Sequence, residues 1–250
     1  MSAGSLQSAW FREATQALAR LEREAQGEVQ AAAELTATRM AAGGALHHFD
    51  TGHTAREPVR RAGGLVALHA IEVDYRLQHP LPPGREPGGL KQSYYYDSEE
   101  LGRMVAQRSH LRAGDVLWLV SNSGREAFPL ALALEAQARG VAVVAVTCVA
   151  FSRAAEARHP SGKRLYEVAE RVIDTRGPVG DASVPVPALG TPIAPLSGLL
   201  NVAACWALTA ATIEALLARG VTPSVYRSVN LPDGFAWNDR VEAAYRARGI

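Results

Sequence analysis

The most restrictive feature of this 250-residue sequence is a pair of apolar runs, DVLWLV at 115–120 and VAVVAVT at 141–147. Strands that are apolar at nearly every position are buried on both faces, which is typical of parallel sheets covered by helices on each side. A stretch with helical character, 125–140, separates the two runs. The pattern predicts an α/β fold, a three-layer α-β-α sandwich around a mainly parallel five-stranded sheet.

The other elements follow from apolar periodicity and from glycine and proline positions. Apolar residues spaced by threes and fours predict a long N-terminal helix over 8–40, capped by Ser8 and ended by glycines 43 and 44. We expect three more strands, at 45–49, 65–71 and 171–175, and further helices at 55–64, 97–111, 159–170 and 197–219. The segments 79–89 and 177–195, rich in Pro and Gly, are expected to be irregular. We expect one domain, made of an N-terminal helix (1–42), an α/β core (43–219) and a C-terminal extension (220–250) that ends in a short helix.

Composition excludes several classes of function. The 26 basic residues balance the 25 acidic ones and no block of five like charges occurs, so neither a nucleic acid nor a membrane is an expected partner. Cys148 and Cys205 are far apart, and no His or Cys spacing typical of a metal site occurs, so no metal is expected. The dinucleotide-binding GxGxxG pattern is missing, and no cofactor is expected. Without a signal peptide or an 18-residue apolar run, the sequence predicts a soluble, cytoplasmic protein.

The loop SNSG, formed by Ser121, Asn122, Ser123 and Gly124, directly follows the strand DVLWLV. In open α/β sheets, ligands bind outside the carboxyl ends of the strands. Hydroxyl donors, a glycine that lets the backbone approach, and free N–H groups at the next helix start suit a phosphate group. The alternative is structural: Ser123 caps a helix and Gly124 relaxes a turn. Both interpretations fit the loop taken alone.

A second loop, DTGHT at 50–54, ends the first predicted strand in the same way. Gly52 permits a tight turn, Thr54 is able to cap the next predicted helix, and His53 lies between them. Because the carboxyl ends of parallel strands meet at one edge of a sheet, we expect this loop to lie beside the SNSG loop.

The order of these motifs resembles the sugar isomerase (SIS) domain over about residues 31–219. A closer likeness is to stand-alone bacterial SIS proteins described as phosphosugar isomerases, carried by TGHT, RAGGL, SNSG, LEAQARG, HPSGKRLYEVAE, GDA and YRSVNLPDG. The resemblance implies a flavodoxin-like fold and a small phosphorylated sugar as ligand. It also implies a homodimer or homotetramer. The implied ligand-binding residues are Gly52, Thr54, Ser121, Asn122, Ser123, Gly124 and Thr147.

The resemblance further implies aldose–ketose isomerisation through an enediol, which needs a base and a group that moves the oxygen proton. The candidate catalytic residues are Glu57, His53 and His159. Members of the phosphoheptose isomerase type carry a His in the last long helix, whereas this chain has none between 197 and 219. Two alternatives therefore stay open: a non-catalytic phosphosugar-binding protein, or a lyase or etherase acting on a phosphorylated amino sugar. His47 and His48 alternate along one strand, so at most one of them faces the site. The segments 79–96 and 228–239 are expected either to complete the pocket or to pack in an interface.

Overall fold

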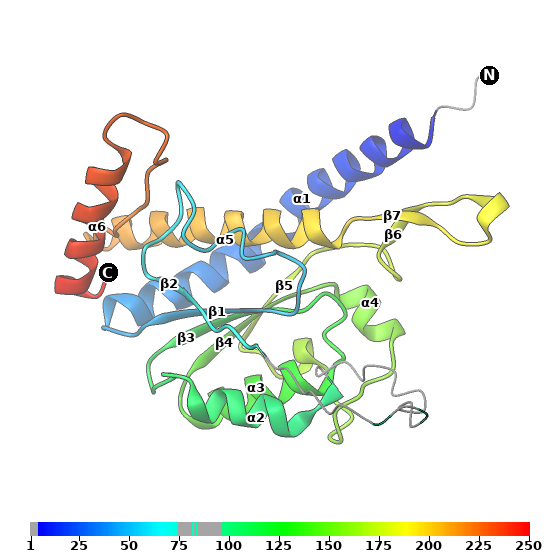
Figure 1. The fold of residues 1–250 in the computed structure, drawn as a ribbon, viewed down its shortest axis with the longest axis horizontal. Helices are drawn as coiled ribbons and strands as arrows, with labels where there is room; N and C mark the ends of the chain where they lie inside the picture. Colours follow the sequence, from blue (N-terminus) through cyan, green and yellow to red (C-terminus); the bar gives the residue numbers. More distant parts are fainter. Residues whose placement is uncertain (1–4, 75–81, 83, 85–96) are drawn as a thin grey trace.

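A five-stranded parallel sheet lies at the centre of the structure, a computed structural model that describes residues 5–74, 82, 84 and 97–250 (Figure 1). The strand order is β2-β1-β3-β4-β5, and every neighbouring pair is parallel. The strands are β1 (Leu46–Asp50), β2 (Leu68–Ala70), β3 (Val116–Val120), β4 (Ala142–Thr147) and β5 (Arg171–Asp174). The predicted α/β class and parallel sheet are confirmed.

Helices cover both faces of the sheet. The long helices α1 (Leu6–Ala41) and α5 (Ser197–Ala218) lie together on one face, while α2 (Glu99–Arg108) and α3 (Ala127–Ala138) lie on the other (Figure 1). Two further α-helices, α4 (Val149–Ala154) and α6 (Gly234–Arg248), complete the set among the described residues. Ser5, rather than Ser8, caps α1, with its hydroxyl accepting from the Ser8 backbone N–H.

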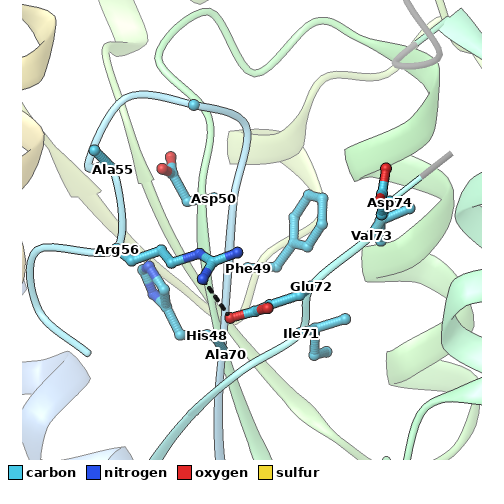
Figure 2. Close-up of a pocket in the computed structure, with 11 residues that line it drawn as sticks. His48, Phe49, Asp50, Ala55, Arg56, Ala70, Ile71, Glu72, Val73 and Asp74 are labelled. Carbon is cyan, nitrogen blue, oxygen red and sulfur yellow. Dashed lines mark ion pairs between the residues drawn. The ribbon is translucent and has the colours of Figure 1, made fainter. Parts of the chain in front are cut away.

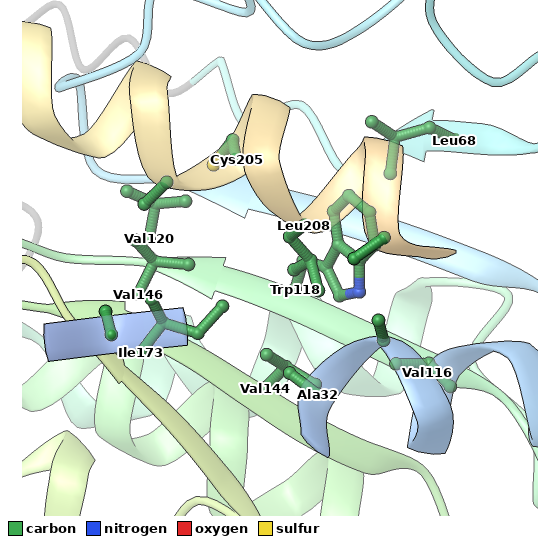
Figure 3. Close-up of a cluster of buried hydrophobic side chains, with 14 of the residues drawn as sticks. Ala32, Leu68, Val116, Trp118, Val120, Val144, Val146, Ile173, Cys205 and Leu208 are labelled. Carbon is green, nitrogen blue, oxygen red and sulfur yellow. The ribbon is translucent and has the colours of Figure 1, made fainter. Parts of the chain in front are cut away.

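The core under α1 and α5 is built from the alternate residues of the central strands that face this side. Figure 3 shows Val116, Trp118 and Val120 of β3 packed with residues of β4 and α5. The Trp118 indole N–H donates to the Thr36 hydroxyl of α1 at 3.1 Å, so this large buried ring keeps its hydrogen bond. α5 is the one helix in the described parts of the chain that is long and apolar enough to cross a membrane. More than half of its apolar window is buried inside the protein, as in the core helix of a globular domain.

Three predictions of local structure were wrong. The segment 55–64 is a series of turns rather than a helix, because Ala55 and Arg56 have positive φ angles of +48° and +65°. The segment 159–170 contains only a 3-10 turn, Leu165–Glu167. The Pro- and Gly-rich segment 177–195 contains an antiparallel hairpin of β6 (Ala182–Val184) and β7 (Ile193–Pro195), joined through a 3-10 turn, Pro187–Leu189.

Strand register aligns the carboxyl ends of the inner strands. Asp50 pairs with Val120, Val120 with Val146, and Thr147 with Asp174. The chain leaves four adjacent strands at one edge, where ligands of open α/β sheets bind. Most of the predicted loop 79–96 falls outside the described residues. The segment 228–239 runs into α6, at the end of the molecule away from α4 in Figure 1.

Candidate functional site

The two loops that the sequence singles out lie side by side at the carboxyl edge. The Thr51 N–H donates to the Val120 carbonyl at 3.1 Å, which fastens the start of the TGHT loop to the end of β3. The Ser121 N–H donates in turn to the Val146 carbonyl at 3.1 Å. Both loops therefore continue the sheet ladder by one residue before they diverge, and their relative position is set by the sheet.

The Asp50 carboxylate holds the TGHT loop in its turn. One oxygen accepts from the His53 N–H at 2.9 Å, and the other accepts from the Thr54 N–H at 2.9 Å and the Thr54 hydroxyl at 3.0 Å. This is the side-chain-to-backbone turn typical of aspartate. Thr54 is buried and its hydroxyl donates to Asp50, so Thr54 supports the loop, while Gly52 is exposed. No role was predicted for Asp50, although an Asp at the first position of such a turn is a recognisable signal.

In the SNSG loop, three of the four residues are buried, and Ser123 alone is partly exposed. The Asn122 carbonyl accepts from the Thr147 hydroxyl at 3.1 Å and from the Cys148 N–H at 2.9 Å. Thr147, at the end of β4, thus fixes the path of the loop. Ser123 carries the loop's most accessible hydroxyl.

Gly124 sits where no other residue fits without displacement. Its φ angle is +56°, and a Cβ atom added there would lie 2.9 Å from the Thr147 hydroxyl oxygen. Its carbonyl accepts from the Leu165 N–H at 2.8 Å. The glycine therefore lets the loop pack tightly against β4 and the segment after α4.

His53 has a defined tautomer. Its Nδ1 lies 3.1 Å from the Ser197 hydroxyl oxygen, and that hydroxyl donates to an Asp181 carboxylate oxygen at 2.7 Å. Since the Ser197 proton points to Asp181, the Ser197 oxygen accepts, so His53 Nδ1 carries a proton. Nε2 of the neutral ring then keeps its lone pair, which suits it to take up a proton.

Asn201 joins this group to the SNSG loop. Its side-chain N–H groups donate to the Ser197 carbonyl at 2.8 Å and to the Asn122 side-chain oxygen at 3.4 Å. Asn201 comes to the site from α5. Ser197 and Asp181 were not predicted, because their relation to His53 depends on a contact between residues 144 positions apart.

The other two catalytic candidates have their own partners. The Glu57 carboxylate pairs with Arg61 at 3.1 Å and is partly exposed. His159 is buried, and its Nδ1 accepts from the Ser161 N–H at 3.1 Å, so its other nitrogen carries the proton and faces Glu99 at 3.7 Å. The structure does not bring His159 into hydrogen-bond contact with His53.

An ion-pair cluster at the start of α3 was not predicted. The Arg158 guanidinium donates to Asp97 at 2.5 Å and to Glu126 at 3.0 Å, joining the segments before α2 and α3. Burial and a hydrogen bond with Asp97 raise the pKa of Glu126 above its usual range. No local pattern marks this cluster, since its members come from three separate segments of the chain.

A cavity of about 500 Å³ opens beside the TGHT loop, along the ends of β1 and β2 (Figure 2). It is lined by His48, Asp50, Gly52, Arg56, Glu72 and Asp74 among others. Arg56 and Glu72 form an ion pair at 3.0 Å within it. In the described ranges, no group of three or more His, Cys, Asp or Glu side chains is arranged to hold a metal ion.

Comparison with known proteins shows to which family the chain belongs. The family model described as SIS domain matches residues 9–148, more than half of the chain. The chain belongs to the SIS domain family. A UPF0309 protein of Streptomyces griseus subsp. griseus is similar to this SIS domain protein, at 34% identity over 251 residues that cover 99% of this chain and 98% of the relative.

Two further proteins are similar to this chain, one in sequence and one in structure. A UPF0309 protein of Caldanaerobacter subterraneus subsp. tengcongensis is 35% identical over 224 residues, which cover 88% of each chain. The solved structure of a phosphoheptose isomerase from Neisseria gonorrhoeae matches with a TM-score of 0.54 at 18% sequence identity, covering 84% of this chain and all of that one. At this identity the match shows a shared fold.

Proposed function

We propose that this SIS domain protein binds a sugar phosphate at the carboxyl edge of its sheet, with the phosphate on the SNSG loop. Membership of the SIS family supports this proposal. The observation that carries it is the tightly packed SNSG loop itself, whose path is set by Thr147 and by the left-handed Gly124. A backbone held in this way fixes the N–H groups that follow Ser121 before a ligand binds, and such preorganised groups suit a phosphate.

For the reaction, we infer that the protein interconverts the aldose and ketose forms of this sugar phosphate through an enediol. A base takes a proton from the carbon next to the carbonyl group and returns it to the neighbouring carbon. The lone pair on His53 Nε2 supports His53 in this role, and the contact with Ser197 and Asp181 stabilises the imidazolium that forms. Glu57 and His159 are second candidates, because each is already engaged with a neighbour, Arg61 and Ser161.

Binding is tested by thermal shift with phosphorylated sugars, each compared with its unphosphorylated form. A ligand that binds the native state raises the melting temperature by mass action. We expect phosphorylated sugars alone to stabilise the wild type, and Ser123→Ala to lose the shift. Ser8→Ala, a change at an exposed serine of α1, is the matched control and should keep it. Equal shifts in wild type and Ser123→Ala would remove the loop from the ligand site.

The reaction is tested on the tightest sugar phosphate by NMR in deuterated water. An enediol mechanism places solvent deuterium on the carbon next to the carbonyl group as the isomers interconvert. His53→Gln should lower this rate by about 10²- to 10⁴-fold, the usual contribution of a general base, while the thermal shift is kept. A wild type that binds but neither exchanges nor interconverts the sugar is a phosphosugar-binding protein without this activity.

We also propose that the protein is a cytoplasmic homo-oligomer, a dimer or a tetramer. A groove of about 490 Å³ runs between α1 and α5 on the side away from the sheet, and it is lined by Leu18, Val29, Ala203 and Ala207 among others. Small and apolar side chains that face outward from two packed helices favour contact with a second copy of the chain.

A further inference from the structure

His48 is a buried titratable group without a role in the site described so far. It lies in β1 and is 2% exposed, and neither ring nitrogen has a hydrogen-bond partner within the described residues. The neighbouring His47 differs, since its Nε2 lies 3.1 Å from the Asp115 carboxylate. A polar group that is buried without a partner is destabilising, so such groups are rare in native structures, and a missing ligand is one explanation for them.

The unpartnered imidazole borders the cavity beside the TGHT loop (Figure 2). Burial lowers the pKa of His48 to about 4, so the ring is neutral at pH 7. A neutral imidazole offers one N–H donor and one acceptor nitrogen, and a sugar hydroxyl complements either of them.

The charges around the cavity disfavour binding of a phosphate and favour binding of hydroxyl groups. Three carboxylates line it, Asp50, Glu72 and Asp74, against one guanidinium, Arg56. A doubly charged phosphate would be repelled by this excess of negative charge, whereas hydroxyl groups donate readily to carboxylates.

The ion pair that lines the same cavity as His48 is easily displaced. The side chains of Arg56 and Glu72, whose ion pair crosses the cavity in Figure 2, are 67% and 55% exposed. Ion pairs with this exposure contribute little to stability, because water competes for both charges. A ligand therefore displaces them at small cost.

The cavity lies within reach of the SNSG loop. β1 and β3 are neighbours in the sheet, with Asp50 opposite Val120. His48 therefore lies one strand away from Ser121 and three residues further from the edge, a separation of about 11 Å between Cα atoms by the usual strand spacings. A phosphorylated sugar that lies between the two residues spans this gap.

We propose that the cavity receives the hydroxyl-bearing part of the sugar phosphate, with a ring nitrogen of His48 hydrogen-bonded to a sugar hydroxyl. The inference rests on the proposed function, since the phosphate of the same ligand lies on the SNSG loop. It assigns His48 to specificity: the residue recognises the sugar and makes no contact with the phosphate.

The test measures dissociation constants by calorimetry for ribose 5-phosphate, glucose 6-phosphate, fructose 6-phosphate and inorganic phosphate. His48→Leu removes both nitrogens, and His48→Gln keeps one donor and one acceptor. His110→Leu, a change at an exposed histidine, is the matched control.

We expect His48→Leu to weaken the tightest sugar phosphate about tenfold, the effect of one lost hydrogen bond in a buried site. Inorganic phosphate should change by less than about twofold, and His48→Gln should recover part of the loss. The melting temperature of His48→Leu should equal or exceed that of the wild type, because the mutation removes an unpartnered buried polar group. If the His48 ring instead stabilised the fold, His48→Leu would have a lower melting temperature than the wild type.

Two results overturn the inference in different ways. If a sugar phosphate binds His48→Leu as tightly as the wild type, or if inorganic phosphate is weakened equally, His48 does not recognise the sugar, and the proposed function is untouched. If none of the three sugar phosphates binds the wild type, the proposed function fails and takes this inference with it.

Discussion

Replacing Gly124 by alanine tests the packing of the SNSG loop. The φ angle of +56° is in the left-handed region, where a residue with a Cβ atom costs about 1–2 kcal/mol. The new methyl group would lie 2.9 Å from the Thr147 hydroxyl and 3.3 Å from the Leu165 Cβ atom, and overpacking of this kind costs a further 1–3 kcal/mol or so. The sum is about 3 kcal/mol, which for a chain of this size lowers the melting temperature by about 6–12 °C.

Gly190 provides a control that separates the two contributions. It has a similar φ angle, +65°, but a Cβ atom added there meets nothing within 4 Å. Gly190→Ala should therefore show the backbone cost alone, a decrease of about 2–8 °C in a calorimetric scan at pH 7. Equal decreases in the two variants would refute the argument, because they would mean that Thr147 and Leu165 do not confine the loop.

Three other predictions address the helices and the buried histidine. Gly27→Ala should raise the melting temperature by about 2–4 °C, since Gly27 is exposed inside α1 and the added methyl group meets no other atom within 4 Å. Leu18→Glu should convert the proposed oligomer to a monomer in light scattering, because it places a charge in the groove between α1 and α5, and an unchanged mass would exclude this groove as the interface. Because the pKa of His48 is lowered to about 4, the unfolded chain takes up a proton that the folded chain refuses as the pH falls from 6.5 to 4. The free energy of unfolding therefore falls by up to about 3 kcal/mol over this range. In denaturant titrations, the free energy of unfolding of His48→Leu should depend less on pH between 6.5 and 4 than that of the wild type.

The sheet could be predicted because its central strands carry a strong local signal. The runs at β3 and β4 are apolar at nearly every position, which is typical of strands that are buried on both faces. The β6–β7 hairpin was not predicted because proline and glycine usually end regular structure. These short segments are strands only through the pairing of Ala182 with Pro195 and of Val184 with Ile193. The sequence predicts a helix at 55–64 because Ala and Arg favour helices. Their residue types do not show that Ala55 and Arg56 adopt left-handed backbone angles.

The positions of the two loops of the candidate site could be predicted, but the residues that hydrogen-bond to His53 could not. SNSG and TGHT are local motifs at strand ends, and parallel topology then implies that they meet. The partners that orient His53 come from the hairpin and the start of α5, through Asp181 and Ser197. Such contacts depend on the tertiary fold, so no spacing in the sequence predicts them.

The arrangement of α1 also has a consequence for the order of folding. α1 packs against α5 and β5, although it is made long before either of them. In contrast, α2, β3, α3 and β4 follow one another along the chain and pack within this short stretch, α2 against α3 and β3 against β4. Since closing long loops is slow and local contacts form early, we expect the α2–α3 side of the sheet to gain hydrogen-exchange protection first in a refolding experiment. The apolar stripe of α1 would then stay uncovered until α5 has been made, which exposes this helix to aggregation in a nascent chain.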